Sequence, residues 1–147
     1  MPVQIQLLGA CDAAVLQRVA PGVFDGPVDS RWTAEFLADK RHHLVVALDA
    51  AEVVGMASGV HYVHPDKPAE LWINEVGVAP THQGQGVGRQ LLDALLAHGR
   101  ALGCRVAWVL TDRENPAAER LYESAGGARA PAGGRMYAFE LNSGEAP

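Results

Sequence analysis

Three glycines at alternate positions, Gly84, Gly86 and Gly88, form the part of this sequence best suited to hold a ligand. Glycine has no Cβ, so a ligand can approach the backbone closely there. The following segment, Leu91–Ala97, has leucines at i, i+1, i+4 and i+5, which predicts a helix with one apolar stripe. The first N–H groups of a helix lack intrahelical partners and carry partial positive charge. The sequence therefore predicts an anion site suited to a phosphate or pyrophosphate.

Spacing excludes two common phosphate-binding loops. A Walker loop needs Gly-Lys followed by Ser or Thr, whereas this chain has Gly88-Arg89-Gln90. The dinucleotide pattern Gly-x-Gly-x-x-Gly does not fit glycines at 84, 86 and 88. The remaining alternative is a glycine-rich turn that binds nothing, and the elements around the loop weigh against it.

Two predicted strands frame the loop and its helix. Glu70–Val78 is expected to be a central strand, with Leu71-Trp72-Ile73 buried and Pro80 marking the turn that follows. Arg105–Thr111 is expected to be the next strand, and it is apolar enough to be buried on both faces. A strand–helix–strand unit of this length fits the right-handed crossover between parallel strands.

A further helix is predicted after the second of these strands. Asn115 suits its N-cap, Pro116 its first turn and Gly126 its stop. This segment also carries the pattern Asn-x-x-Ala-x-x-Leu-Tyr-x-x-x-Gly, which is met by Asn115, Ala118, Leu121, Tyr122 and Gly126.

Together with the loop, this pattern resembles the GNAT superfamily of N-acetyltransferases. The loop meets the acetyl-coenzyme A pattern Gln-x-x-Gly-x-Gly through Gln83, Gly86 and Gly88, after a strand ending in Val-x-Val-x-Pro. The two motifs run from about Glu70 to Gly127, and the N-terminal third matches in element order only. The resemblance implies an α/β (α+β) fold: a mixed, mostly antiparallel central sheet with helices on both faces. It also implies a splay between two parallel central strands, in which the pantetheine of acetyl-CoA lies.

The resemblance places the co-substrate, acetyl-CoA, on named residues. Backbone groups of Val76 and Val78 would hold the pantetheine amides, and the N–H near Val78 would stabilise the oxyanion. Asn115 would hydrogen-bond the cofactor, cap its helix, or do both. The pyrophosphate would lie on the loop and helix start, over Gln83, Gly84, Gln85, Gly86, Val87, Gly88 and Arg89.

Two side chains are candidates for proton transfer. Tyr122 stands where the family has its general acid, and a phenol with a pKa of about 10 suits protonation of a thiolate. Glu75 stands where many relatives carry a catalytic carboxylate, and a carboxylate in an apolar strand is costly to bury unpaired. We therefore expect Glu75 to be the base, often acting through water. His61 and His64 are rival bases. The alternatives are a Tyr122 ring that only packs and a Glu75 that faces solvent or forms an ion pair.

The acceptor is the least constrained part of the prediction. The chain resembles aminoglycoside 3-N-acetyltransferases in its length, its loop Phe24–Pro27 and its ending Phe139-Glu140-Leu141. On that resemblance Phe24, Asp25 and Glu140 would contact a small cationic amine. The equally weighted alternative is that Phe24 is a core side chain and Asp25 a turn residue. A protein, peptide or amino-acid amine is the alternative acceptor, and a non-catalytic acyl-CoA-binding module is the alternative function.

The rest of the chain completes a single domain over residues 1–141. Asp12 is expected to cap a helix over Ala13–Val19, and Ser30 a helix over Arg31–Ala38 with Trp32, Phe36 and Leu37 on its apolar face. The remaining predicted strands are Val3–Leu8, Leu44–Leu48, Val53–Tyr62 and Arg135–Leu141, and residues 142–147 are expected to be a flexible tail.

Composition limits the partners. The 147 residues carry 12 Lys and Arg against 17 Asp and Glu, without a basic run, so no nucleic-acid partner is expected. No apolar run is long enough for a membrane span, and two separated cysteines suggest a reducing, cytoplasmic compartment. No metal is expected, since the histidines lack ligand spacing and are interpreted as surface residues. A homodimer is left open.

Overall fold

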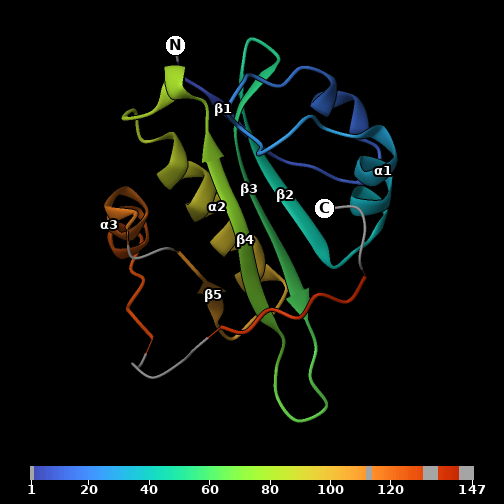
Figure 1. Cartoon of the computed structure of the whole chain (residues 1–147), viewed down its shortest axis with the longest axis vertical. Coiled ribbons are helices and arrows are strands. Elements are labelled where there is room, and N and C mark those ends of the chain that lie inside the picture. Colours follow the sequence, from blue (N-terminus) through green and yellow to red (C-terminus); the bar gives the residue numbers. More distant parts are fainter. Residues whose placement is uncertain (1, 112–113, 131–135, 143–147) are drawn as a thin grey trace.

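The computed structural model describes residues 2–111, 114–130 and 136–142, and in them the chain forms one mixed sheet (Figure 1). The strand order is β1-β2-β3-β4-β5. The first four strands pair antiparallel with their neighbours, and β4 and β5 pair parallel. The strands are β1 Gln4–Leu7, β2 His42–Asp49, β3 Glu52–Tyr62, β4 Glu70–Val78 and β5 Ala107–Val109.

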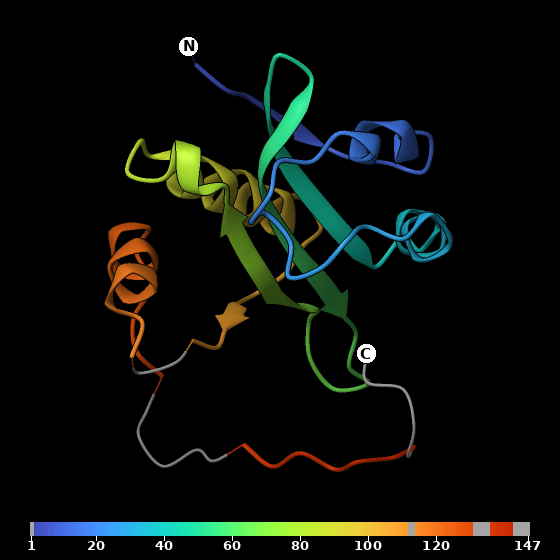
Figure 2. The same cartoon turned by 45° about the horizontal axis from the view of Figure 1, so that its top comes forward.

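Helices cover both faces of the sheet, as predicted (Figure 2). Helix α2, Val87–Ala101, packs on one face beside α3, Pro116–Ser124. Helix α1, Ser30–Ala38, and the 3-10 helix η1, Ala13–Gln17, lie on the other. A second 3-10 helix, η2, Pro80–His82, connects β4 to the glycine loop.

The core lies on both faces of the sheet, under α2 on one face and under α1, η1 and the segment between them on the other. Helix α2 contributes Leu91, Leu92 and Leu95, which are all fully or almost fully buried, in agreement with the predicted leucine stripe. At Gly55 in β3 an added Cβ would lie 2.9 Å from Leu91 Cδ1, so glycine allows the helix to approach the strand closely. The buried apolar side chains of the sheet are Leu44, Val45, Val46, Ala47, Val53, Val54, Met56, Ala57, Leu71 and Ile73.

A β-bulge interrupts β4 near its centre. Ile73 pairs with Gly59 and Glu75 with Ser58, so Asn74 is the extra residue on the β4 side. Before the bulge, Leu71 and Ile73 face α2. After it, Val76 and Val78 face α2, and Glu75 points to the opposite face. A one-residue insertion therefore changes which side chains of this strand point to which face.

The N-terminal helices differ in detail from the prediction. Asp29, not Ser30, caps α1, because its carboxylate accepts from the Trp32 N–H at 3.0 Å. Leu37 is buried and Phe36 packs against the core, as expected, but Trp32 is 60% exposed and does not belong to the apolar face of α1. The first helix is a short 3-10 turn, and Asp12 accepts from Gly9 N–H instead of capping it.

Two predicted strands are also corrected. Strand β5 spans only Ala107–Val109, and it is an edge strand of the described sheet with Trp108 39% exposed, so it is not buried on both faces. The last predicted strand is not formed over Met136–Leu141, and Arg135 lies outside the described residues. In this segment Met136, Tyr137, Phe139 and Leu141 are all largely exposed, so alternation alone was not enough to form a strand there. Of the predicted tail, only Asn142 is described.

Candidate active site

The candidate site begins where β4 loses its neighbour. Strand β5 pairs with β4 only from Leu71 to Ile73, and the rest of β4, through Val78, has no partner on that side among the described residues. Backbone N–H and C=O groups on this side have no strand partner beyond Ile73 and can bind another group, apart from the Val78 carbonyl, which accepts from Gln83. The two parallel strands therefore separate as predicted, at the end of β4 nearest the glycine loop (Figure 1).

The N-terminus of α2 opens onto the same end of the sheet. Gly84 and Gly86 have φ of 74° and 80°, in the left-handed region that favours glycine, and a Cβ added to either would meet nothing within 4 Å. Gly86 is the N-cap, and no side chain caps the helix. The N–H groups of Val87, Gly88 and Arg89 thus have no intrahelical acceptor, and the loop leaves room for an anion above them.

The polar side chains of the loop hold its shape. Gln83 Nε2 donates to the Val78 carbonyl at 3.1 Å, and Gln85 Nε2 donates to the Thr81 carbonyl at 3.3 Å. Arg89 Nε donates to both carboxylate oxygens of Asp93, one turn along α2. Val87 is buried and belongs to the core. The residues predicted to bind the cofactor are therefore gathered at one end of β4. The side chains of Gln83 and Gln85 support the loop, and the start of α2 presents its backbone N–H groups.

Helix α3 brings Tyr122 to this end. A Cβ added to Gly88 would meet Leu121 at 3.5 Å and Val78 at 3.7 Å, so α3 packs across the start of α2 and the end of β4. Asn115 caps α3, accepting from the Ala118 N–H at 3.1 Å. Tyr122, the next residue after Leu121, is half-buried, and burial raises the pKa of its phenol.

Glu75 lies on the other face of β4 from α2, immediately after the bulge. It shares this face with Gly77, where an added Cβ would overlap the Val23 carbonyl oxygen. The chain segment before α1 therefore runs directly over the end of β4. Glu75 is exposed overall, but the partial desolvation of its carboxyl raises the pKa of this group, and the nearby Asp25 carboxylate raises it further. A carboxylate with raised pKa is a stronger base than an ordinary glutamate.

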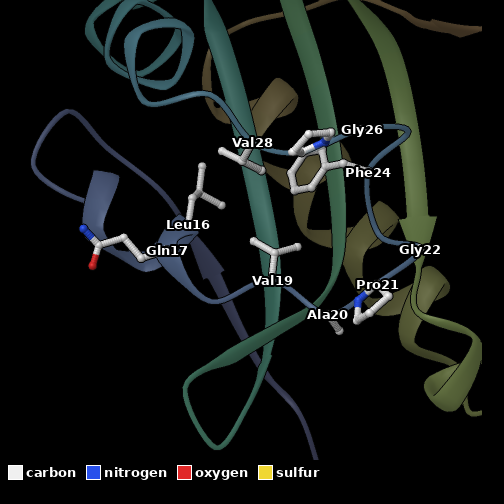
Figure 3. A pocket seen from close by; sticks show the side chains of 10 residues that line it. Leu16, Gln17, Val19, Ala20, Pro21, Gly22, Phe24, Gly26 and Val28 are labelled. Atoms are coloured by element: carbon white, nitrogen blue, oxygen red, sulfur yellow. The ribbon is translucent and has the colours of Figure 1, made fainter.

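Phe24 and Asp25, two of the three residues predicted to contact the acceptor, lie in different surroundings. Phe24 lines a cavity of about 360 Å³, whose ten lining residues all lie between Leu16 and Val28 (Figure 3). Asp25 is exposed and is not among them, but its charge acts on Glu75. The structure thus brings Asp25 to the β4 face that carries Glu75.

Glu140 is not brought to this site. It lies in the exposed segment Met136–Asn142, which both views place at the end of the sheet where β4 begins (Figures 1 and 2). The rival bases are also at that end, because His61 pairs with Leu71, and His64 Nε2 lies 3.3 Å from Glu70 Oε2.

The histidines are not all surface residues. His43 is 6% exposed and lies between His61 and His98, with nitrogen–nitrogen distances of 2.7 and 3.0 Å. Its burial and the two neighbouring imidazoles lower the pKa of His43 to about 4. No sequence pattern pointed to this cluster, since the three residues lie on β2, β3 and α2. No group of three or more metal-ligating side chains is arranged around a common point in the described parts of the chain.

The family comparison agrees with this geometry. The model of the Acetyltransferase (GNAT) family matches residues 15–127. The chain belongs to the GNAT acetyltransferase family.

This GNAT acetyltransferase has similar relatives of two kinds. It is 34% identical over 140 residues to the N-alpha-acetyltransferase RimI of Mycobacterium tuberculosis, and the alignment covers 92% of this chain and 85% of the relative. It is 37% identical over 110 residues to a mycothiol acetyltransferase of Thermomonospora curvata, covering 71% of this chain but only 36% of that longer relative.

A solved structure shows the same fold at low identity. An aminoglycoside acetyltransferase from an uncultured soil metagenomic sample, in complex with trehalose, superposes with a TM-score of 0.79 over 94% of this chain and 97% of its own, at 20% identity. Family membership makes the chain an acyl-CoA-dependent N-acetyltransferase, and the family uses acetyl-CoA. No helix in the described ranges has the length and apolar character to cross a membrane.

Proposed function

We propose that this acetyltransferase moves an acetyl group from acetyl-CoA to a primary amine by direct attack in a ternary complex, within a single domain over residues 1–141. The observation that carries the proposal is the coincidence of two openings. The side of β4 after Ile73 is unpaired, and the uncapped N-terminus of α2 lies at the same end. One extended ligand can therefore use both sets of backbone groups.

The residues present fit acetyl-CoA. The free N–H groups at Val87, Gly88 and Arg89 suit its pyrophosphate, and the space above Gly84 and Gly86 accommodates it. The unpaired side of β4 at Val76 and Val78 suits the amides of pantetheine. Bound acetyl-CoA would supply an activated thioester, in which the carbonyl carbon forms a C–N bond as its C–S bond breaks.

Glu75 is proposed to accept the proton that the amine loses. Its raised pKa increases its basicity, and its exposure leaves room for a water between carboxylate and amine. It lies on the face of β4 covered by the segment Val23–Asp25, so the amine would approach from that side.

Tyr122 is proposed to protonate the departing thiolate. Its raised pKa keeps the phenol protonated at neutral pH, as an acid requires. The backbone N–H near Val78 is proposed to stabilise the oxyanion, because a fixed donor on the unpaired side of a strand needs no reorganisation.

The acceptor class that we favour is the α-amine of a peptide or protein. The support is the similarity to an N-alpha-acetyltransferase over 92% of this chain and 85% of that relative. A small cationic amine, including an aminoglycoside, is the second candidate, and the nearby carboxylates of Asp25 and Glu75 favour it because they attract positive charge.

A thiol-release assay with acetyl-CoA and a panel of amines tests the proposal. The panel would contain short peptides with free N-termini, the same peptides with blocked N-termini, an aminoglycoside and single amino acids. Release that requires a free peptide α-amine supports the first candidate, whereas release with the aminoglycoside alone supports the second. Binding of acetyl-CoA without amine-dependent release would identify a non-catalytic acyl-CoA-binding module.

A further inference from the structure

A histidine just before the glycine loop is tied to a hairpin far away in the sequence. His82 Nε2 lies 2.8 Å from Asp49 Oδ2, and His82 Nδ1 lies 2.8 Å from Thr81 Oγ1. Asp49 ends β2, and His82 ends η2, 33 residues further along the chain. We call Asp49, Thr81 and His82 the latch.

The chemistry of the latch determines the direction of each hydrogen bond. A carboxylate only accepts, so Nε2–H of His82 donates to Asp49. In the neutral imidazole Nδ1 then carries the lone pair and accepts from the Thr81 hydroxyl. Both ring nitrogens are thus used inside the latch, and His82 has none left for proton transfer to a substrate. Its role is to hold a position.

The latch connects the β2–β3 hairpin to the loop that contains Gly84 and Gly86. On one side, Asp49 precedes the tight turn Ala50-Ala51. The carbonyl of Val54, the third residue of β3, accepts from the Ala79 N–H at 2.8 Å. On the other side, Gln83 and Gly84 follow His82 directly. The side-chain bond from His82 to Asp49 therefore ties the chain to the β2–β3 hairpin, one residue before Gln83 bonds to the Val78 carbonyl and the loop turns through Gly84 and Gly86.

We infer that His82 is a positioning residue for the pyrophosphate of acetyl-CoA, acting through its bond to Asp49. The inference rests on the proposed function, since it presumes that the loop binds the pyrophosphate. The latch fixes where the loop leaves the sheet, and hence where the N–H groups of Val87, Gly88 and Arg89 point. Without the latch, the loop would have to become ordered when acetyl-CoA binds, and the free-energy cost of that ordering would lower the affinity.

The experiment compares two acetyl donors in His82→Ala and Asp49→Ala. With acetyl-CoA, we expect KM and the calorimetric Kd to rise about tenfold, equivalent to one charged hydrogen bond, while kcat stays within about twofold. With S-acetylpantetheine, which has the thioester but no pyrophosphate, kcat/KM should be unchanged. His82→Gln should restore most of the affinity, because its amide N–H can reach Asp49.

His42→Ala is the matched control. His42 also contacts an aspartate, Asp39, with Nδ1 3.2 Å from Oδ2, but at the start of β2, away from the loop. It should leave both donors unaffected. The double variant His82→Ala/Asp49→Ala should be no weaker than the weaker single variant, since both remove the same bond.

The possible failures are distinguishable. If the unmodified protein does not bind acetyl-CoA, the proposed cofactor site fails and the inference fails with it. If the protein binds acetyl-CoA and the variants bind equally well, or if both donors lose activity in parallel, the latch does not position the pyrophosphate. Should His82→Ala not fold, Asp49→Ala removes the same bond and gives the same comparison of donors, with His82→Gln as the variant that keeps the bond.

Discussion

Strand β4 carries two glutamates in opposite surroundings, one at its start and one beyond its bulge. Glu70 Oε1 accepts a 2.8 Å hydrogen bond from the Trp108 indole N–H, which lowers the pKa of Glu70, with His64 close to its other oxygen. Glu75 has its pKa raised by burial and by Asp25. The same side chain is held as a stable anion at one end of the strand and made more basic at the other.

The difference follows from how the sheet is completed. At the start of β4, β5 pairs alongside and brings Trp108 to Glu70. Beyond Ile73, β5 no longer pairs with β4, and backbone groups on that side of β4 can bind a ligand. Groups whose pKa values are pushed apart by their surroundings often have separate roles, and we propose a structural role for Glu70 and a reactive one for Glu75. The predictions below test that contrast.

The largest effect is expected at the glycine loop. Gly86→Asp would place a side chain and a negative charge where the pyrophosphate is proposed to bind, and we expect acetyl-CoA affinity to fall about 10³-fold. Gly103→Asp is the matched control, because Gly103 has φ of 83°, similar to Gly86, and equally open space, but lies after the far end of α2. Both variants should lose similar stability by thermal unfolding, and calorimetry should find a loss of binding in Gly86→Asp alone. Equal binding by both would remove the pyrophosphate from this loop.

Removal of the Tyr122 hydroxyl should have the next largest effect. Tyr122→Phe keeps the ring that packs against the core, so Tm and acetyl-CoA affinity should barely change. Loss of the proton donor should lower kcat by roughly 10²-fold. A thiol-release assay with an established amine measures this, and an unchanged kcat would leave Tyr122 as a packing residue.

Exchanging the two glutamates for glutamine should give opposite results. Glu75→Gln should lower kcat/KM by at least about tenfold at neutral pH and leave Tm unchanged, because glutamine cannot accept the proton. Glu70→Gln should lower Tm by a few degrees and leave kcat/KM unchanged, because it weakens the bond from Trp108. Loss of activity in both, or in Glu70→Gln alone, would contradict the assignment of the reactive carboxylate.

The pH profile sharpens the same contrast. If Glu75 is the base, kcat/KM rises with pH through its raised pKa, and Asp25→Asn should move that limb to lower pH, because it removes a neighbouring negative charge. Deprotonation of the acceptor's own ammonium would also produce a rising limb. A limb that follows the pKa of the amine and stays in place in Asp25→Asn would belong to the substrate.

The smallest effect is expected for the buried histidine of the cluster His43, His61 and His98. His43 has a folded-state pKa of about 4 against an ordinary value of 6.5, so between these pH values the unfolded chain binds more protons than the folded one. Stability should therefore fall as pH drops from 6.5 to 4. Urea unfolding across this range should be less pH-dependent in His43→Gln, while the exposed His42→Gln keeps the dependence of the parent. An identical dependence in His43→Gln would exclude His43 as its source.

Local patterns predicted the parts of the fold that local chemistry determines. The leucine stripe of α2, the burial of Leu71 and Ile73, and the Asn115 cap depend on neighbours in the sequence, and each is present as predicted. The short β5 and the absent strand at Met136–Leu141 depend instead on which edges are available for pairing, and alternation does not report that.

The contacts missed at the site all join distant segments. Asp25 acts on Glu75 from 50 residues away in the chain, and Asp49 bonds His82 across 33 residues. The charge and size of each residue were visible in the sequence, but their partners were not. His43 was misassigned to the surface for the same reason, since its burial depends on α2 crossing β2.

The extra residue Asn74 has a consequence for how relatives of this chain should be aligned. In an unbulged strand Glu75 would share the face of Leu71 and Ile73 and point beneath α2. Whether Glu75 points toward Val23–Asp25 or toward α2 thus depends on the number of residues before it in the strand, which the one extra residue changes. An alignment gap placed a few residues from position 74 would match Glu75 to a side chain on the wrong side of the sheet. In this strand, comparison of reactive carboxylates between homologues is meaningful only after their bulges are superposed.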